Sequence, residues 1–500
     1  MNQGDVTQGI DGMRTRNGAL AFDGRFRVAF VLFGGMVVLQ SSQTLDAPKI
    51  VYLVGTFVCL VAALGAVRRA RRTPAVRLGS QWLMASGALA VLIAISFLIA
   101  RASGTPPTDW LRDAANYALF AAVPIFALDA QASASRKLLV GMLVVAGLLG
   151  GVSWSVEWLS RRQILELPFD RLVFPSAQVP SMLYVFAMAK ALTDRRRTAM
   201  WVALAGVTLG FFIVTGTRSS LLLLIGPFAM AALAGWALIR HSLKTLVLHW
   251  VVALAVLLVF QLALALPAIL GPGRAGGEPS ASGPAPTAGP TVAEGPTILD
   301  DRFTSLPTVI TNPATDDSVR ERVAQYRAAW TLFVSSPIVG VGPGHPIEWI
   351  DVSGYPRSGF TADTPLVMPA KFGLLGIVVF LGFAGAYGAT VRRAVQLDRR
   401  SEVTLTLVGF GVLTILGLPL GFLVEDKGAS LALILLLALA FTERRATLSD
   451  SGSSGELHAS IIDEGRQSDD AQRPLRFEGT GPAPLHNRLG LQSGSATTRR

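Results

Sequence analysis

Apolar runs alternate with short polar segments along most of this chain. A helix needs about 17–25 mainly apolar residues to cross a bilayer, and most of the runs have that length. We therefore predict an all-α, polytopic integral membrane protein with about 12 transmembrane helices. After a short first run at 28–39, the predicted spans lie near 49–67, 82–100, 113–128, 137–159, 174–192, 198–214, 220–239, 246–268, 366–389, 403–424 and 428–442.

One long interruption, residues 269–365, divides the spans into two groups. It begins with a Gly/Pro/Ser/Ala-rich spacer at 269–299, whose composition is typical of an extended linker without a core. The end of the chain is rich in Ser, Gly, Asp and Arg, which predicts a disordered segment. The predicted division is a cytoplasmic tail at 1–24, spans 1–9 within 25–268, the loop 269–365, spans 10–12 within 366–442, and a disordered cytoplasmic tail at 443–500.

The basic residues predict the orientation of the spans, because cytoplasmic loops carry an excess of Lys and Arg. With the N-terminus in the cytoplasm, the inner loops hold clusters such as Arg68–Arg72, Arg195–Arg197 and Arg399-Arg400, whereas the outer loops hold fewer basic residues. This orientation puts the loop 269–365 outside the cytoplasm.

Within that loop, residues 316–345 form the most patterned segment. Ser318 and Glu321 have the spacing of a capping box, which predicts the start of a helix. Pro337 ends the helical pattern, and the run Gly340–Gly344 predicts a sharp turn. We therefore predict an arginine-bearing helical hairpin over 316–345, with an apolar stripe made of Val319, Val323, Tyr326, Trp330 and Phe333.

Composition excludes several classes of protein. The mean hydropathy is +0.49 and only 15% of the residues are charged, which excludes an ordinary soluble domain of this length. The single cysteine, Cys59, lies in an apolar run, so no disulfide framework or thiolate metal site is predicted. The formal net charge of +11 is spread over short clusters between apolar runs, which is typical of membrane topology and argues against a nucleic-acid partner.

The chain also lacks the sequence motifs of common cofactor sites. It contains no GxxxxGK[ST] phosphate loop, no HExxH, no paired-cysteine metal motif and no GxSxG elbow. We therefore expect no cofactor, neither a nucleotide nor a metal ion.

Arginines at two places in the chain could bind an anion. Arg218 lies between two apolar runs at the predicted outer side, where it is either an interfacial arginine or a guanidinium that binds a phosphate. Arg322 and Tyr326 are four residues apart and share one helix face, which is either a solvated face with an aromatic anchor or part of a binding site.

Two further positions could supply a general base. His345 directly follows the predicted turn, and it is either a polar surface residue or a base. Asp363 precedes the next span, where it is either a helix cap or a carboxylate that faces a site.

Four short motifs, in this order, resemble the O-antigen ligase/polymerase family, which includes ligases and polymerases of lipid-linked polysaccharides. The resemblance covers about residues 200–390. Its motifs are Thr215-Gly216-Thr217-Arg218-Ser219-Ser220, Arg322-x-x-x-Tyr326-x-x-Ala329-Trp330, the run Pro337–Gly344, and Gly373-Leu374-Leu375-Gly376.

Members of this family have a multi-span membrane fold with a large periplasmic or extracellular loop. They move a glycan from an undecaprenyl-diphosphate donor to a glycan or lipid acceptor, without a nucleotide or a metal. The resemblance thus implies a metal-independent glycosyltransferase of the bacterial inner membrane that acts in cell-surface polysaccharide biosynthesis. It also implies that Arg218 and Arg322, with Tyr326 beside them, bind the donor diphosphate.

The chain departs from the family's pattern at two places. Ligases of the family carry a His-Asn pair where this chain has Ala362-Asp363, and an acidic residue is often found at the position of Lys371. Either Asp363 or His345 then acts as the base, or the protein is a polymerase-type relative whose base the sequence does not identify, or it does not catalyse. A non-enzymatic transporter of an anionic or lipid-linked solute is the alternative, which broken helices and a charge pair within the membrane would favour.

Overall fold

The structure, a computed structural model, describes residues 80–133, 135–161, 178–214, 225–234, 316–418 and 428–442, with positions 247–248, 251–252 and 255. Several predictions lie wholly outside the described residues: the tail 1–24, the spans at 28–39 and 49–67, the spacer 269–299, the tail 443–500 and the residue Arg218.

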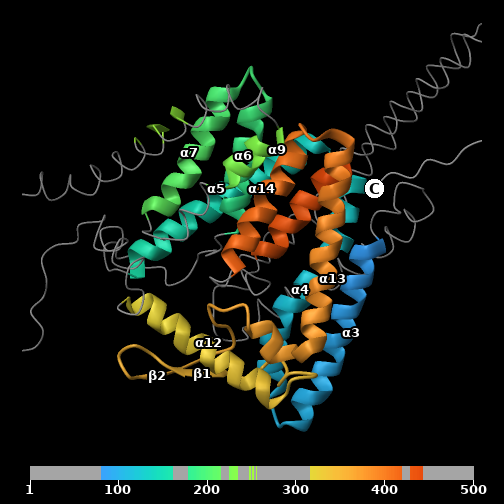
Figure 1. The fold of residues 1–500 in the computed structure, drawn as a ribbon, viewed down its shortest axis with the longest axis vertical. Helices are drawn as coiled ribbons and strands as arrows, with labels where there is room; N and C mark the ends of the chain where they lie inside the picture. The colour runs from blue at the N-terminus through green and yellow to red at the C-terminus, as the bar shows by residue number, and fades with distance from the viewer. Residues whose placement is uncertain are drawn as a thin grey trace, which may run out of the picture. The chain divides into compact units, whose positions relative to one another are not determined.

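The described part is mostly helical, as predicted (Figure 1). The helices α3, α5 and α7 correspond to predicted spans, and the other helices fall on predicted spans or on the loop. Their bounds are α3 Ser80–Ala102, α4 Pro107–Ser133, α5 Arg136–Arg161, α6 Gln178–Thr193, α7 Thr198–Val214, α9 Ile225–Ala234, α12 Asp317–Ser335, α13 Val367–Asp398, α14 Glu402–Gly417, and an unlabelled helix at Gly428–Thr442.

Within the described residues, four helices are long and apolar enough to cross a membrane: α3, α4, α5 and α13. Three shorter apolar helices lie at Thr198–Phe212, Glu402–Gly417 and Gly428–Thr442. The total of about 12 spans stays a prediction, because several of these spans lie wholly or partly outside the described residues.

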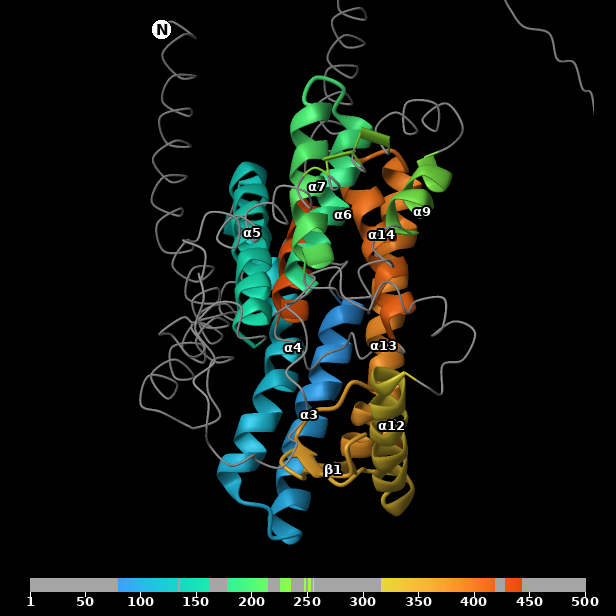
Figure 2. The same ribbon diagram turned by 90° about the vertical axis from the view of Figure 1, so that its left-hand side faces the viewer.

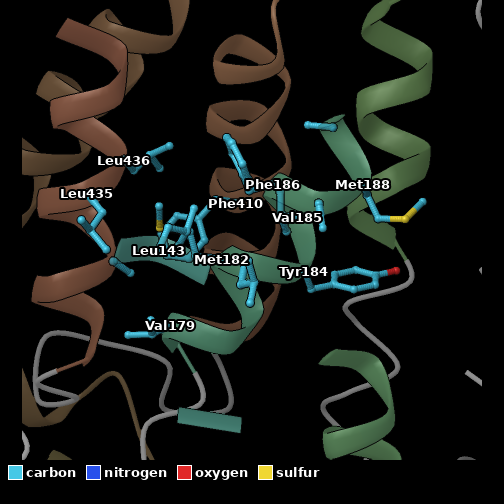
Figure 3. Close-up of a cluster of buried hydrophobic side chains, with 14 of the residues drawn as sticks. Leu143, Val179, Met182, Tyr184, Val185, Phe186, Met188, Phe410, Leu435 and Leu436 are labelled. Carbon is cyan, nitrogen blue, oxygen red and sulfur yellow. The ribbon is translucent and has the colours of Figure 1, made fainter. Parts of the chain in front are cut away.

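The core consists of two clusters of apolar side chains. The first surrounds α6, which is buried on nearly all sides by α5, α7, α14 and the Gly428–Thr442 helix. Figure 3 shows this cluster, in which Met182 and Phe186 of α6 lie among Leu143, Phe410 and Leu435 of the neighbouring helices. The second cluster joins α3, α4 and α13, again with the Gly428–Thr442 helix.

One carboxylate, Glu402, connects three helix ends. Glu402, the first residue of α14, pairs with Lys190 near the end of α6 at 2.7 Å and with Arg136 at the start of α5. The distribution of basic residues predicts all three ends on the cytoplasmic side. The helix ends that we expect on one side thus lie together, and the side itself stays a prediction.

The loop segment after α12 contacts the spans where α3 ends and α4 begins (Figure 2). Two short strands follow, β1 at Ile347–Ile350 and β2 at Pro356–Gly359, which pair antiparallel with Ile347 opposite Gly359. This hairpin departs from the all-α prediction. Each strand has only four residues, too few to give a period-two pattern that the sequence reveals.

Candidate functional site

Helix α12 begins at a cap that differs from the predicted one. The N-cap is Asp316, whose side chain accepts a hydrogen bond from the amide of Val319 at 3.0 Å. The capping box predicted from Ser318 is therefore wrong, because Ser318 already lies inside the helix. An aspartate at this position satisfies a free amide and also places a negative charge at the positive end of the helix dipole.

The buried face of α12 also differs from the predicted stripe. Gln325 and Ala329 are buried, and Arg322 and Tyr326 are half-buried beside them. Trp330, which belongs to the predicted stripe, is 53% exposed. The helix therefore turns a partly polar face toward the protein.

The chain after α12 turns back through a glycine-rich segment, the glycine turn (residues 336–344). The predicted second arm of a helical hairpin is absent here, since the segment 336–346 forms turns and β1 follows directly. Gly340 and Gly344 have positive φ angles of 70° and 85°, which glycine adopts without strain. There is also no room for a side chain, because a Cβ at Gly340 would lie 2.2 Å from the carbonyl carbon of Lys371.

The glycine turn bonds to the backbone of α13 where that helix is broken. Gly373 has φ 62° and ψ −155°, which interrupts the helix after its first turns. The amide of Leu374 donates to the carbonyl of Pro337 at 2.8 Å, and the amide of Gly342 donates to the carbonyl of Lys371 at 2.9 Å. Backbone groups that the break releases are thus satisfied by the turn, which an apolar environment requires.

A buried ion pair connects the same turn to α4. Lys371 of α13 pairs with Asp113 of α4, and both side chains are only 1% exposed. The same carboxylate oxygen of Asp113 accepts a hydrogen bond from the amide of Gly344 at 2.7 Å. Asp113 thereby holds α4, the glycine turn and the first turns of α13 together. Sequence analysis missed Asp113, although an aspartate inside a predicted span was a usable signal.

The ring of Phe360 lies near two cations at this junction. Its ring centroid is 4.9 Å from the Arg112 guanidinium carbon and 5.8 Å from the Lys371 ammonium nitrogen. Such distances are typical of cation–π contacts.

The segment before α13 is held against α12 by two hydrogen bonds. The amide of Asp363 donates to the side-chain oxygen of Gln325 at 2.7 Å, and the hydroxyls of Thr364 and Tyr326 are bonded to each other. The carboxylate of Asp363 itself is exposed. Asp363 therefore lies near the helix turn that carries Arg322 and Tyr326.

Arg322 and Tyr326, predicted to share a face, do lie close together. Burial raises the pKa of Tyr326 above its usual value, and this outweighs the opposing effects of its bond with Thr364 and of the nearby Arg322 charge. Tyr326 is thus a neutral hydroxyl at ordinary pH. The Nε of Arg322 is buried and has no hydrogen-bond partner among the residues that the structure describes.

The other predicted residues are not joined to this cluster. His345 is half-buried, and the described part of the chain offers its side chain no hydrogen bond or ion pair. Arg320 and Arg327 are exposed, and Arg320 pairs with Asp317 at 3.3 Å. Over the described ranges, no group of three or more His, Cys, Asp or Glu residues could hold a metal ion.

Two comparisons with known proteins bear on this site. No curated protein matches the chain. Residues 202–386 match the family model described as O-antigen ligase (Wzy_C), a segment that runs from α7 into α13 and includes α12, the glycine turn and Asp363. Asp113 and Arg112 lie outside it. This match supports an O-antigen ligase family assignment for the segment 202–386, and the apolar helices indicate an integral membrane protein.

Proposed function

We propose that the protein is a glycosyltransferase that moves or polymerises a glycan from an undecaprenyl-diphosphate donor, on the outer side of the bacterial inner membrane. The family assignment supports a role in cell-surface polysaccharide biosynthesis, an enzyme of the glycosyltransferase kind and a lipid-linked glycan as its partner. The donor, the direction and the transfer step are our proposal.

One observation carries the proposal: Arg322 keeps an unsatisfied Nε–H on the protein-facing side of α12 within the matched segment. A guanidinium is planar and presents its donors as a fork that fits phosphate oxygens. Tyr326, one turn later, remains a neutral hydroxyl that can donate a hydrogen bond. Arg322 and Tyr326 are therefore the residues that we propose to bind the donor diphosphate, with Arg218 as a second cation.

The proposed reaction needs one proton transfer and one displacement. A base takes the proton from the acceptor hydroxyl as its oxygen bonds to C1 of the donor sugar. The bond from C1 to the diphosphate oxygen breaks, and the lipid diphosphate leaves with the electron pair. The arginines stabilise the negative charge on this leaving group, which is the usual source of such catalysis.

We propose Asp363 as the base ahead of His345. Asp363 and its neighbour Thr364 are hydrogen-bonded to the same turn of α12 that carries Tyr326 and follows Arg322. His345 has no such contact among the described residues.

A transfer assay with purified protein in liposomes and a lipid-linked donor tests these roles. Charge-assisted hydrogen bonds are worth about 1.5–3 kcal/mol, so Arg322→Lys is expected to slow transfer roughly tenfold or more. Arg322→Ala is expected to slow it further. Arg320→Ala is the matched control on the same helix, because its side chain is exposed and pairs only with Asp317 among the described residues.

The base assignment has its own readout. Asp363→Asn is expected to depress the transfer rate while donor binding is preserved, and His345→Ala is expected to leave the rate near the parental value. The reverse result would move the base to His345, and no effect of either variant would leave the diphosphate site without an assigned base.

A transporter of an anionic or lipid-linked solute is the second candidate. Two observations favour it: α13 is broken at Gly373, and Lys371 and Asp113 form a buried pair between helices that are long enough to span. However, transporter sites lie near the membrane midplane. Asp113 and Lys371 lie in the first turns of α4 and α13, where the glycine turn contacts them. Transfer of glycan without any ion gradient would support the enzyme over the transporter.

A further inference from the structure

The outward face of α12 carries a row of exposed apolar side chains. Val323, Trp330 and Val334 are 43%, 53% and 56% exposed. Their spacings of seven and four residues put them on one side of the helix. Gln325 and Ala329, which are buried, lie on the opposite side.

Basic residues flank this row. Arg327 lies between Val323 and Trp330 along the helix and is exposed, as is Arg320 one helical turn before Val323. A helix with one apolar strip, arginines along the strip and an aromatic residue within it is typical of segments that lie in the membrane interface. Tryptophan in particular is enriched at the level of the lipid headgroups.

The apolar row continues onto a helix that is long enough to span the membrane. Ile338, just after α12, is 64% exposed, and its carbonyl accepts a hydrogen bond from the amide of Leu375 in α13 at 3.3 Å. From there an exposed apolar surface runs along α13, made of Leu374, Leu375, Val378 and Leu381. Figure 1 shows α12 running obliquely beside the broken end of α13.

We infer that α12 lies on the surface of the bilayer, with Val323, Trp330 and Val334 inserted at the boundary between headgroups and acyl chains. The guanidinium of Arg327 then contacts lipid phosphates. The row is then continuous with the lipid-facing side of α13. In this position, Arg322 and Tyr326 on the inner side of the same helix lie at the depth of lipid phosphates. The inference goes beyond the proposed function, because contact between α12 and lipid does not depend on any transfer reaction.

Spin labels on the full-length protein test this contact. The single cysteine is removed as Cys59→Ser, labels are placed one at a time through Val323→Cys, Trp330→Cys and Val334→Cys, and the protein is put into nanodiscs that contain phosphatidylglycerol. Oxygen, which concentrates in lipid, and a water-soluble nickel chelate then compete to relax each label. Val378→Cys on α13 is the bilayer control, and Ser353→Cys in the exposed β1–β2 connection is the solvent control.

The expected result is that the three α12 labels resemble Val378→Cys, with relaxation by oxygen several-fold stronger relative to nickel than at Ser353→Cys. Arg327→Gln is expected to reduce this ratio in nanodiscs with phosphatidylglycerol. Labels that nickel relaxes as strongly as at Ser353→Cys would overturn the inference, because the row would then face water. Labels shielded from both reagents would also overturn it, because protein, such as a second copy of the chain, would then cover the row.

Discussion

The buried pair of Lys371 and Asp113 should make the protein sensitive to the loss of either charge but tolerant of the loss of both. Both side chains are 1% exposed and lie between two helices that are long and apolar enough to span. Lys371→Met leaves the Asp113 carboxylate without its cation, and Asp113→Asn leaves the ammonium without its anion. In either case an uncompensated charge stays buried.

The magnitude follows from that burial. Breaking a buried pair by removing one partner costs about 3–5 kcal/mol of folding free energy. Asparagine at position 113 can still accept the hydrogen bond from the amide of Gly344, so this bond, worth about 1 kcal/mol, is retained. The double variant Lys371→Met, Asp113→Asn has no unpaired charge and is expected to lie within about 1–2 kcal/mol of the parental protein.

A double-mutant cycle measures this coupling. The four proteins are purified in the same detergent, and their unfolding free energies are compared by denaturant titration followed by tryptophan fluorescence. We expect the double variant to be more stable than either single variant, with a coupling energy of at least about 2 kcal/mol. Single variants that match the parental protein, or a double variant that equals the sum of the two losses, would refute the reasoning.

Three further predictions concern the helix break at Gly373, the cap of α12 and the β1–β2 hairpin. Gly373→Ala is expected to reduce the yield of folded protein sharply, since a Cβ there would lie 2.3 Å from the carbonyl carbon of Ile338. The control Gly382→Ala in the same helix is expected to be neutral or slightly stabilising, and size-exclusion profiles would compare the two variants. Asp316→Ala is expected to weaken α12 by about 1 kcal/mol, seen as faster amide hydrogen exchange in its first turn. The amide of Tyr355, with other donors, holds the pKa of Asp351 below its usual value. The contribution of the Asp351 carboxylate to the stability of the β1–β2 hairpin is therefore present above about pH 4 and is lost as pH falls through the lowered pKa. Hydrogen exchange of the hairpin should show this loss in acid, and Asp351→Asn should abolish the pH dependence.

Hydropathy predicted the helices well where a span is a continuous apolar run. The predicted span at 198–214 coincides with α7, and the one at 82–100 lies within α3 at Ser80–Ala102. The prediction for 366–389 was too short, because α13 continues to Asp398 through arginines that lower the local hydropathy without breaking the helix. Hydropathy reports which residues prefer lipid, whereas a helix extends as far as its backbone hydrogen bonds continue.

The site was predictable only as far as local spacing carries information. The i,i+4 spacing correctly predicted that Arg322 and Tyr326 lie close together on α12. The Lys371–Asp113 pair joins residues 258 positions apart, so no local pattern contains it. The break at Gly373 was also hidden, since a glycine inside an apolar run is compatible with a continuous helix until the glycine turn supplies the competing hydrogen bonds.

The central claim is that Arg322 binds the diphosphate of a lipid-linked glycan during transfer. The most direct measurement is the rate at which the purified protein, in sealed liposomes without an ion gradient, consumes an undecaprenyl-diphosphate glycan, compared between the parental protein, Arg322→Ala and Arg320→Ala. The account predicts transfer by the parental protein and by Arg320→Ala at similar rates, and a loss of more than about tenfold in Arg322→Ala at an unchanged amount of folded protein. Transfer by Arg322→Ala at the parental rate would contradict it.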